Sequence, residues 1–319
     1  MAAEMMRYLS RVDVESVGLA GTDVVEILDG VFRAKRAGAV ELPPKIGVHP
    51  REDAFIHAMP AYLAEGDAVG IKWVAGYRDN PGLGLPYIHG LFVLSDAGTG
   101  RPLAVMDATW ITEVRTAAAS MLGIRALSER PIETIGIIGC GRQGHGHLEL
   151  AADVFPGLRR ALLFDRNPER AAAMAAAHPE LGAEPAEAAQ DVAAADVVIT
   201  CAAIVRDPAR PLRRAHLEGA TVACAIDFDA SLSEDVFEDA AAFVVDDVAQ
   251  YRYYREQGYF AGYPDDPIEL CDALDPGASE LGPGLRVYVP LGIALEDVAV
   301  AAEINRRAAD AGLGTELAL

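Results

Sequence analysis

The pattern of hydrophobic and polar positions divides the chain into two regions. Before residue 128, an amphipathic helix that begins at the capping residue Thr22 and ends near Gly38 precedes a series of short apolar runs. Turn residues separate these runs, so we expect a small antiparallel sheet, followed by a helix over 112–127. The predicted strands of this sheet are Val69–Ala75, Ile88–Leu94 and Leu103–Met106.

From about residue 131, short apolar runs alternate with helical segments, a pattern typical of βαβ units in a parallel sheet. Amphipathic character returns in a last helix over 295–311. We therefore expect an α/β fold, in which a Rossmann-type doubly wound parallel sheet over 129–289 accompanies a second α+β domain made of 1–128 and 290–319. The five strands expected in the parallel sheet are Thr134–Ile138, Ala161–Phe164, Asp196–Thr200, Thr221–Ile226 and Ala242–Val245.

Composition narrows the class of partner. The chain has 319 residues, of which 51% are hydrophobic and 24% are charged, and this indicates a globular protein rather than a disordered one. Its 27 basic and 48 acidic residues give a formal charge of −21, so its electrostatic field repels nucleic acids and anionic membrane surfaces. An anionic ligand must therefore be held by local positive groups, and we expect a small molecule as the partner.

The cysteines and the N-terminal segment predict a cytoplasmic protein. The four cysteines form no CxxC pair and lie beside no histidine cluster, which predicts no metal site and fits a reducing compartment. No apolar run approaches the roughly 18 residues of a membrane span. Charges also interrupt the N-terminal segment where a signal peptide would be apolar.

A glycine-rich loop is the strongest motif. Gly139, Gly141 and Gly144 form a GxGxxG pattern between a predicted strand and a predicted helix, which indicates backbone amides that bind the pyrophosphate of a dinucleotide. Asp165 ends the next strand, where an acid bonds the ribose 2′-OH and favours NAD. The adjacent Arg166 could accept a 2′-phosphate, so NADP stays open. The alternatives are FAD, another nucleotide, or a glycine-rich turn without a ligand.

Three basic residues are candidates for binding an anion. Lys72 interrupts an apolar strand, and Arg115 begins an otherwise small and apolar helix surface. The alternatives are a lysine that extends to the solvent and an arginine in a structural ion pair. Lys45, in the segment PPKIGVHP, is less informative by itself, and its sequence context favours a solvated loop lysine.

Two carboxylates follow a strand of the predicted parallel sheet. Asp227 and Asp229 come directly after the predicted strand over 221–226, at the edge of the sheet where ligands bind. Asp229 could instead be a cap for a helix over 231–240. His57 and His89 lie in apolar surroundings that are typical of structural histidines.

Several strings carry a resemblance to the ornithine cyclodeaminase/mu-crystallin family. The resemblance covers nearly the whole chain and implies a homodimer, in which the first and last segments bind substrate and form the dimer while a Rossmann domain is inserted between them. The matching strings are HAMPAYL (57–63), VGIKWVAGYRDNP (69–81), GLPYIHGLFVLSDAGTGRPLAVMDATWITEVRTAAAS (84–120), IGIIGCGRQGHGHLEL (135–150) and LGIALEDVAVAA (291–302).

The resemblance also implies roles for individual residues. Lys72 and Arg115 match the basic residues that hold the substrate carboxylate, and Lys45 matches a further basic substrate ligand. Asp229 matches the catalytic carboxylate, with Lys72 as a second catalytic candidate. His57 departs from the family pattern, and it is a further substrate-binding candidate through its own chemistry rather than through a match. The residues matched to the cofactor are Gly139, Gly141, Arg142, Gln143, Gly144, Asp165, Thr200, Arg115 and Thr116.

The chemistry shared by this family is hydride exchange between an α-amino acid and its imine at a nicotinamide. The resemblance therefore predicts an NAD(P)-dependent imine reductase or amino-acid dehydrogenase whose substrate is an amino, imino or 2-oxo acid. A cyclodeaminase is the second choice, because His57 stands where those enzymes have an acid and the ASLS segment after Asp229 lacks their lysine. His57, His89 and Arg51 could instead suit a substrate with a second carboxylate. A crystallin-like protein that binds the ligand without turnover is the other alternative, against which Asp229 argues.

Overall fold

The computed structural model describes residues 4–205, 207–275 and 281–319. The chain divides into two compact units, one made of Met1–Arg115 with Gly292–Leu319 and the other of Thr116–Leu291. Helix α3 (Thr109–Leu127) carries the chain from the first unit into the second. The assignment of substrate binding and dimerisation to one domain and of dinucleotide binding to the other stays a prediction.

An eight-stranded sheet organises the first unit. Its strands lie in the order β16-β1-β7-β6-β5-β4-β2, with β3 paired to β4. The predicted strands are present as β5, β6 and β7, and their pairing is antiparallel as expected, whereas β1 and β7 run parallel. The strands are β1 (Met5–Leu9), β2 (Val40–Glu41), β3 (Ile46–Val48), β4 (Ala54–Leu63), β5 (Ala68–Tyr77), β6 (Ile88–Asp96), β7 (Pro102–Asp107) and β16 (Thr315–Ala318).

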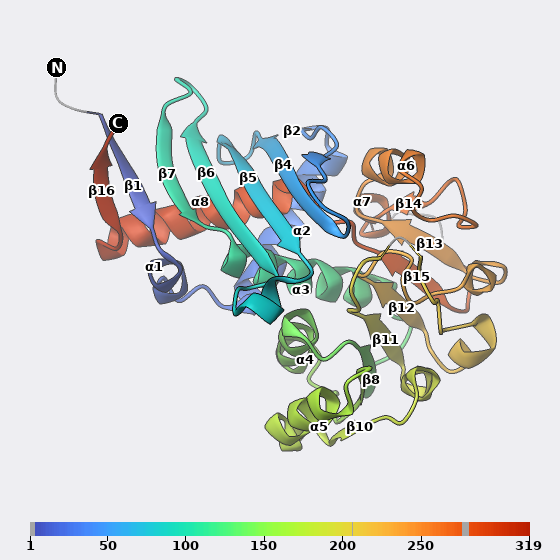
Figure 1. The fold of residues 1–319 in the computed structure, drawn as a ribbon. Helices are drawn as coiled ribbons and strands as arrows, with labels where there is room; N and C mark the ends of the chain where they lie inside the picture. The colour runs from blue at the N-terminus through green and yellow to red at the C-terminus, as the bar shows by residue number, and fades with distance from the viewer. Residues whose placement is uncertain (1–3, 206, 276–280) are drawn as a thin grey trace. The chain divides into compact units, whose positions relative to one another are not determined.

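Helix α8 (Ala294–Ala311) covers one face of this sheet, where it packs against β4, β5 and β6 (Figure 1). Side chains alternate between the two faces along β5, so that Lys72 and Val74 are buried while Ile71 and Trp73 are exposed. Helices α1 (Arg11–Ser16) and α2 (Gly21–Arg36) also contact α8. The buried face of the sheet therefore places Lys72 against α8.

Two expectations for the first unit need correction, and the long strand β4 was missed. The first long helix begins at Gly21 with Ala20 as its cap, so Thr22 is not the capping residue. Helix α3 begins at Thr109 rather than near residue 112, because Asp107 Oδ1 accepts hydrogen bonds from the backbone amides of Thr109 and Trp110. Strand β4 was not among the predicted strands, and it contains Pro60, a residue that usually marks an edge strand or no strand.

The second unit contains a parallel sheet of eight strands in the order β10-β9-β8-β11-β12-β15-β13-β14. The five predicted strands are β8, β9, β11, β12 and β13, and the sheet has three more than expected. The order reverses between β8 and β11, which creates a switch point where ligands bind in doubly wound sheets. The expected α/β fold class, a Rossmann-type sheet plus a second α+β domain, is confirmed. The strands are β8 (Thr134–Ile138), β9 (Arg160–Phe164), β10 (Ala183–Pro185), β11 (Val197–Thr200), β12 (Val222–Ala225), β13 (Ala242–Val245), β14 (Ile268–Glu269) and β15 (Arg286–Val289).

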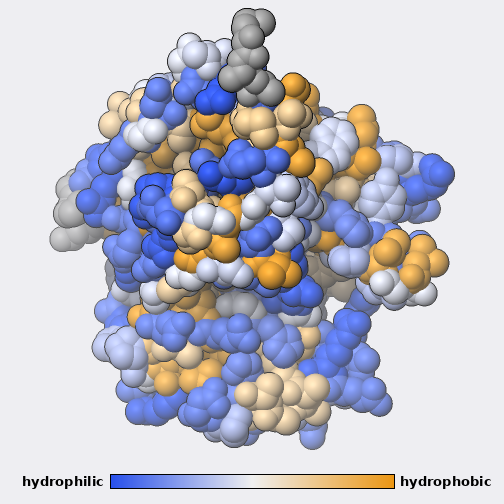
Figure 2. Space-filling model, turned by 90° about the vertical axis from the view of Figure 1, so that its left-hand side faces the viewer, coloured by the Kyte–Doolittle hydropathy of each residue, from blue (hydrophilic) through white to orange (hydrophobic). Residues whose placement is uncertain are grey.

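Helices and short helical turns connect these strands. The helix that the sequence predicted over 231–240 is a short 3-10 turn, Glu234–Phe237. No helix in the described part of the chain is long and apolar enough to span a membrane. Hydrophilic residues cover much of the face drawn in Figure 2, and apolar residues interrupt them. The helices of this unit are α4 (Arg142–Val154), α5 (Pro168–Ala177), α6 (Val248–Glu256) and α7 (Leu270–Ala273).

Candidate active site

The glycine-rich loop joins β8 to α4 at the switch point of the parallel sheet. Gly139 has a φ of 96°, and a Cβ atom there would lie 2.5 Å from the carbonyl oxygen of Cys201. A Cβ atom at Gly144 would collide with the carbonyl oxygen of Gly139. Gly141 differs, because a Cβ atom there would meet no described atom within 4 Å. Gly139 and Gly144 therefore allow the loop to pack, whereas Gly141 leaves open space beside the first amides of α4.

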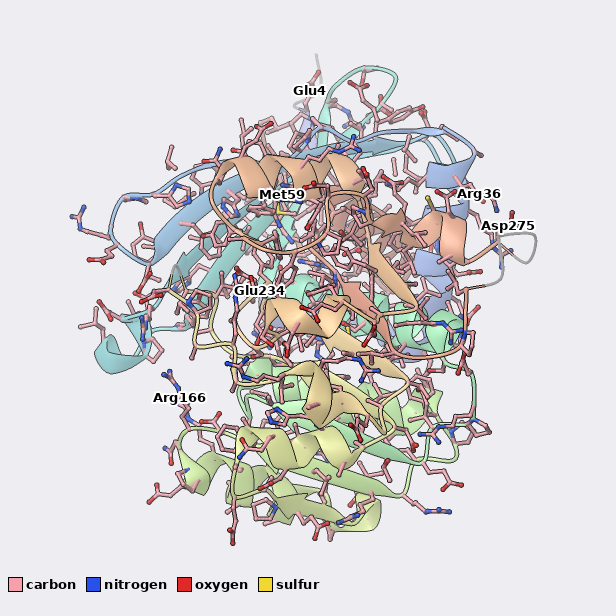
Figure 3. All side chains as sticks on the ribbon, turned by 90° about the vertical axis from the view of Figure 1, so that its right-hand side faces the viewer. Glu4, Arg36, Met59, Arg166, Glu234 and Asp275 are labelled. Atoms are coloured by element: carbon pink, nitrogen blue, oxygen red, sulfur yellow. The ribbon has the colours of Figure 1, made fainter. Side chains whose placement is uncertain are left out.

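Asp165 lies against this loop. Its Oδ2 accepts a hydrogen bond from the backbone amide of Cys140 at 2.9 Å, and its Oδ1 accepts one from the amide of Asn167 at 2.8 Å. The acid predicted to bind the ribose therefore also ties the end of β9 to the loop. The neighbouring Arg166 is exposed, and its side chain extends away from the ribbon in Figure 3.

The other predicted cofactor residues of the second unit lie on α4, β11 and α3. Arg142 is exposed in the first turn of α4, and the next residue, Gln143, has a buried Oε1 with no hydrogen-bond partner in the described residues. Thr200 ends β11 and is buried, and it donates its hydroxyl to Asp227 Oδ1 at 2.5 Å. Thr116 is half-buried on α3. Thr200 thus supports a carboxylate rather than presenting a free hydroxyl.

Asp227 is a buried structural carboxylate. Besides the bond from Thr200, it accepts hydrogen bonds from the Ser231 hydroxyl at 2.6 Å and from the amide of Ala202 at 3.1 Å. Burial raises the pKa of Asp227, and the hydrogen bonds oppose that shift. Asp227 therefore joins the loops that follow β11 and β12.

Asp229 is held differently. Its Oδ2 accepts hydrogen bonds from Arg210 Nη2 at 2.5 Å and from the amide of Phe260 at 3.1 Å, whereas its Oδ1 accepts none from the described residues. Arg210 also donates from Nε to the backbone oxygen of Asp229 and from Nη1 to that of Ala261. Asp229 lines a cavity of about 90 Å³ together with residues 257–259. One carboxylate oxygen is thus fixed, and the other has no hydrogen-bond partner among the residues that the structure describes.

Unusual backbone conformations surround Asp229. Arg210, Phe228 and Phe260 have φ values of 45°, 60° and 59°, in the left-handed region that residues with a Cβ rarely adopt. Arg210 and Phe260 donate hydrogen bonds to the carboxylate. Phe228 precedes Asp229, and its ring packs against that of Phe260 at a tilt of 37°, with 5.4 Å between the ring centroids. Such conformations cost about 1–3 kcal/mol each and gather at functional sites. The strained backbone that positions this carboxylate therefore lowers the stability of the fold.

The first unit brings its predicted basic residues together around two acids of α8. Lys72 is fully buried on β5 and donates to Asp297 Oδ1 at 2.7 Å. Arg115 donates from Nε to the same oxygen at 3.2 Å and from Nη1 to Glu296 Oε2 at 3.0 Å. Lys45 is buried and donates to the backbone oxygen of Gly292 at 3.3 Å. We call Lys45, Lys72, Arg115, Glu296 and Asp297 the buried charge cluster.

The buried charge cluster contains three basic and two acidic groups, so one positive charge remains when all are ionised. Burial, aided by the neighbouring Arg115, lowers the pKa of Lys72 to about 8, while Asp297 opposes this shift. Asp297 Oδ2 is buried with no hydrogen-bond partner in the described residues. Gly292 has a φ of 76°, and a Cβ atom there would lie 2.6 Å from Arg115 Nη1. The glycine therefore leaves room for the guanidinium group.

The histidines and Arg51 are arranged less favourably for holding an anion. Burial and the nearby Lys45 lower the pKa of His57 to about 3, so its imidazole is neutral near pH 7. Its ring stacks on Phe55 with 4.4 Å between centroids. His89 and Arg51 are exposed on the first unit. His57 can form a hydrogen bond with a substrate but adds no positive charge.

Sequence reasoning missed three charged groups of these sites. Glu296 and Asp297 are fully buried in α8, and a signal existed, since two adjacent acids interrupt the apolar string LGIALEDVAVAA. Arg210 lies in the irregular segment between β11 and β12, where no periodicity distinguishes it. Only its hydrogen bonds to Asp229, seen in the structure, show its role.

Known proteins resemble this chain over nearly its full length. A family model described as the ornithine cyclodeaminase/mu-crystallin family matches residues 3–312. The nodulation efficiency protein NfeD of Rhizobium meliloti is 36% identical over 317 residues, which cover 97% of this chain and 98% of that protein.

Two solved structures share the fold. One is the Thermococcus litoralis Δ1-pyrroline-2-carboxylate reductase in complex with NADH and L-proline, with a TM-score of 0.84, 26% identity and coverage of 97% of this chain and 99% of that chain. The other is an archaeal alanine dehydrogenase dimer with bound NAD, with a TM-score of 0.86, 26% identity and coverage of 98% and 99%. The chain therefore belongs to the ornithine cyclodeaminase/mu-crystallin family, as its sequence motifs suggested.

Proposed function

We propose that this protein is an NAD-dependent oxidoreductase that transfers hydride between a nicotinamide and an α-amino acid or the corresponding α-imino acid. The observation that carries the proposal is the buried charge cluster, whose net positive charge favours one anion. The carboxylate of an amino acid supplies that anion. The relatives described as alanine dehydrogenase and Δ1-pyrroline-2-carboxylate reductase support this reaction class.

The loop after β8 fits a dinucleotide. The open space beside Gly141 and the amides at the start of α4 suit a pyrophosphate, and the Asp165 carboxylate suits a ribose 2′-OH. When bound, the nicotinamide accepts or supplies the hydride. We propose NAD rather than NADP, since Asp165 repels a 2′-phosphate, and Arg166 is the group through which NADP would be accepted.

The first unit binds the substrate carboxylate in this proposal. Lys72 and Arg115 hold the carboxylate, while Asp297 accepts hydrogen bonds from both and fixes their positions. Fixing the carboxylate restricts the rotation of Cα, and binding energy is thereby used for orientation. Lys45 adds a third positive group, and His57 adds a neutral ring that contacts the substrate side chain.

Asp229 moves the proton. In the oxidative direction its carboxylate takes a proton from the substrate ammonium group, and Cα of the resulting amine then loses hydride to form the protonated imine. In the reductive direction the same group returns a proton to nitrogen. Oδ1 is the oxygen available for this transfer because Arg210 and the Phe260 amide hold Oδ2. Arg210 is thus a positioning residue for Asp229.

A homodimer is the proposed assembly. Ile71, Trp73 and Leu91 are 36%, 51% and 47% exposed on the outer face of the first sheet, and Trp73 lies directly opposite Leu91 on the neighbouring strand. An exposed apolar group of this kind in a strongly charged protein marks an interaction surface. A second copy of the chain covers it in our proposal, which the dimeric relative supports. Trp73→Lys should therefore shift the mass measured by light scattering toward the monomer.

We also propose a cytoplasmic location. The four cysteines, all of which lie in the described part of the chain, are free thiols. Free buried thiols persist in a reducing compartment.

A spectrophotometric screen tests the proposed function. NADH and NADPH are each mixed with 2-oxo acids and either ammonia or methylamine, and L-ornithine, L-alanine and L-aspartate are tested with NAD. The proposal predicts a change in absorbance at 340 nm that requires both the acid and the amine. Conversion of L-ornithine to a cyclic product without a net change at 340 nm would indicate a cyclodeaminase instead. NADH binding without turnover of any substrate would indicate a binding protein.

A further inference from the structure

Two histidines and a glutamate converge on the surface of the second unit, away from the residues used above. His145 and Glu149 lie one turn apart on α4 and so share a face of that helix. His178 is the residue at the C-terminal cap of α5. Each of the three offers a ligand atom, and these atoms lie within 4.8 Å of one another. We propose that His145, Glu149 and His178 form a binding site for a divalent transition-metal ion such as Zn²⁺.

The donor set selects the class of ion. Two imidazole nitrogens and one carboxylate oxygen suit Zn²⁺, Co²⁺ or Ni²⁺, whereas Mg²⁺ and Ca²⁺ prefer oxygen ligands. Ligand atoms at 2.0–2.2 Å from a tetrahedral Zn²⁺ are about 3.4 Å apart, so the three side chains need small rotations to close on an ion. Both histidines are half-buried and Glu149 is exposed, which leaves room for these rotations and for a water molecule as the fourth ligand.

The surroundings of the three residues favour this role. Glu180 Oε1 lies 3.4 Å from His178 Nδ1, where a carboxylate orients the ring and leaves Nε2 for a metal. His147, two residues after His145, is not available, because it is buried and its ring nitrogens contact the Gln143 carbonyl oxygen and the Ser120 hydroxyl. The formal charge of −21 attracts cations to the protein as a whole. Of the two histidines in the HGH string, His147 is therefore structural and His145 is the one available to bind a metal ion.

An ion at this site joins α4 to the end of α5, the helices that follow the adjacent strands β8 and β9. The site contains none of the residues proposed for hydride transfer, so it stands or falls independently of the proposed function. Sequence spacing did not indicate it, because His178 caps a different helix from the one that carries the other two ligands.

The test is Zn²⁺ binding to the full chain without an affinity tag, after treatment with a chelator. Isothermal titration should show one ion per chain at micromolar or lower Kd, and excess Mg²⁺ should not compete. Saturating Zn²⁺ should raise the thermal unfolding temperature, since the ion binds the folded state. His145→Ala, Glu149→Gln and His178→Ala should each weaken binding at least about tenfold and remove the thermal shift.

His49→Ala is the matched control, because His49 is an exposed histidine on the first unit whose ring lies near that of His57. Its Zn²⁺ binding should equal that of the wild type. Circular dichroism of each variant establishes that the fold is retained. The proposal is overturned if the wild-type protein binds no Zn²⁺ at about 1 mM, or if folded His145→Ala and His178→Ala proteins bind it as tightly as the wild type.

Discussion

Raising the pH should weaken binding of the substrate carboxylate through a single group, Lys72. This lysine is fully buried, and burial together with the adjacent Arg115 lowers its pKa to about 8, against a usual value of 10.5. Below pH 8 Lys72 is protonated, and the buried charge cluster has one positive charge in excess. Above pH 8 Lys72 loses its proton, and the cluster becomes neutral. The attraction for a carboxylate is then lost.

The size of the effect follows from this pKa. With a value of about 8, the protonated fraction of Lys72 is roughly 90% at pH 7, 10% at pH 9 and 1% at pH 10. If only the protonated form binds the carboxylate, affinity should fall about tenfold between pH 7 and pH 9 and about tenfold again by pH 10.

The assay is the Kd of the best 2-oxo acid for the complex of protein and NADH, measured by fluorescence from pH 7 to pH 10. The carboxylate of a 2-oxo acid stays ionised over this range, so the ligand contributes no titration of its own. Lys72→Met is the control, and its affinity should be low and independent of pH. An affinity that stays constant for the wild type, or a decrease that persists in folded Lys72→Met, would refute the reasoning.

Three further predictions concern the second unit. Gly141→Val should lower NADH affinity at least about hundredfold without loss of fold, whereas Gly144→Val should unfold the loop, as fluorescence titration and circular dichroism can measure. Unchanged NADH affinity in Gly141→Val would exclude this loop as the dinucleotide-binding site. Asp165→Ala should weaken NAD about tenfold more than NADP in the same titration, and equal losses would contradict its assigned contact with the 2′-OH. Arg210→Ala should lower kcat about 10–100-fold with little change in KM, because the carboxylate loses the group that holds its Oδ2 in place. An unaltered kcat, or a change confined to KM, would contradict the role of Arg210 in positioning Asp229.

The parts of the fold that could be predicted are those with a local signal. Strand β13 is a short apolar run that is buried along its whole length, and β8 is buried at every residue after Thr134, so hydrophobicity alone identifies both strands. Strand β15 begins with the buried Arg286, which is paired with Glu129, and a charged first residue conceals the strand. Strand β4 is concealed by Pro60.

The candidate site divides in the same way. The glycines and Asp165 stand in one continuous strand, turn, helix and strand pattern, so sequence alone predicts their proximity. Lys72 and Arg115 can each be identified from the sequence as candidate binding residues, because each interrupts an apolar surface. Their partner Asp297 is distant along the chain, and only the packing of α8 on the sheet brings it to them. Arg210 has no sequence signal at all, since its role depends on loop geometry.

The rate of NADH oxidation at 340 nm in wild-type and Asp229→Asn proteins tests the central claim most directly, with a 2-oxo acid and ammonia as substrates. The wild type should oxidise NADH only when both substrates are present. Asp229→Asn should bind NADH normally and turn over at least about a hundredfold more slowly, because its side chain cannot transfer the proton. Wild-type turnover by a folded Asp229→Asn protein would contradict the mechanism. Absence of oxidation by the wild type with every acid and amine, despite NADH binding, would contradict the assignment as an enzyme.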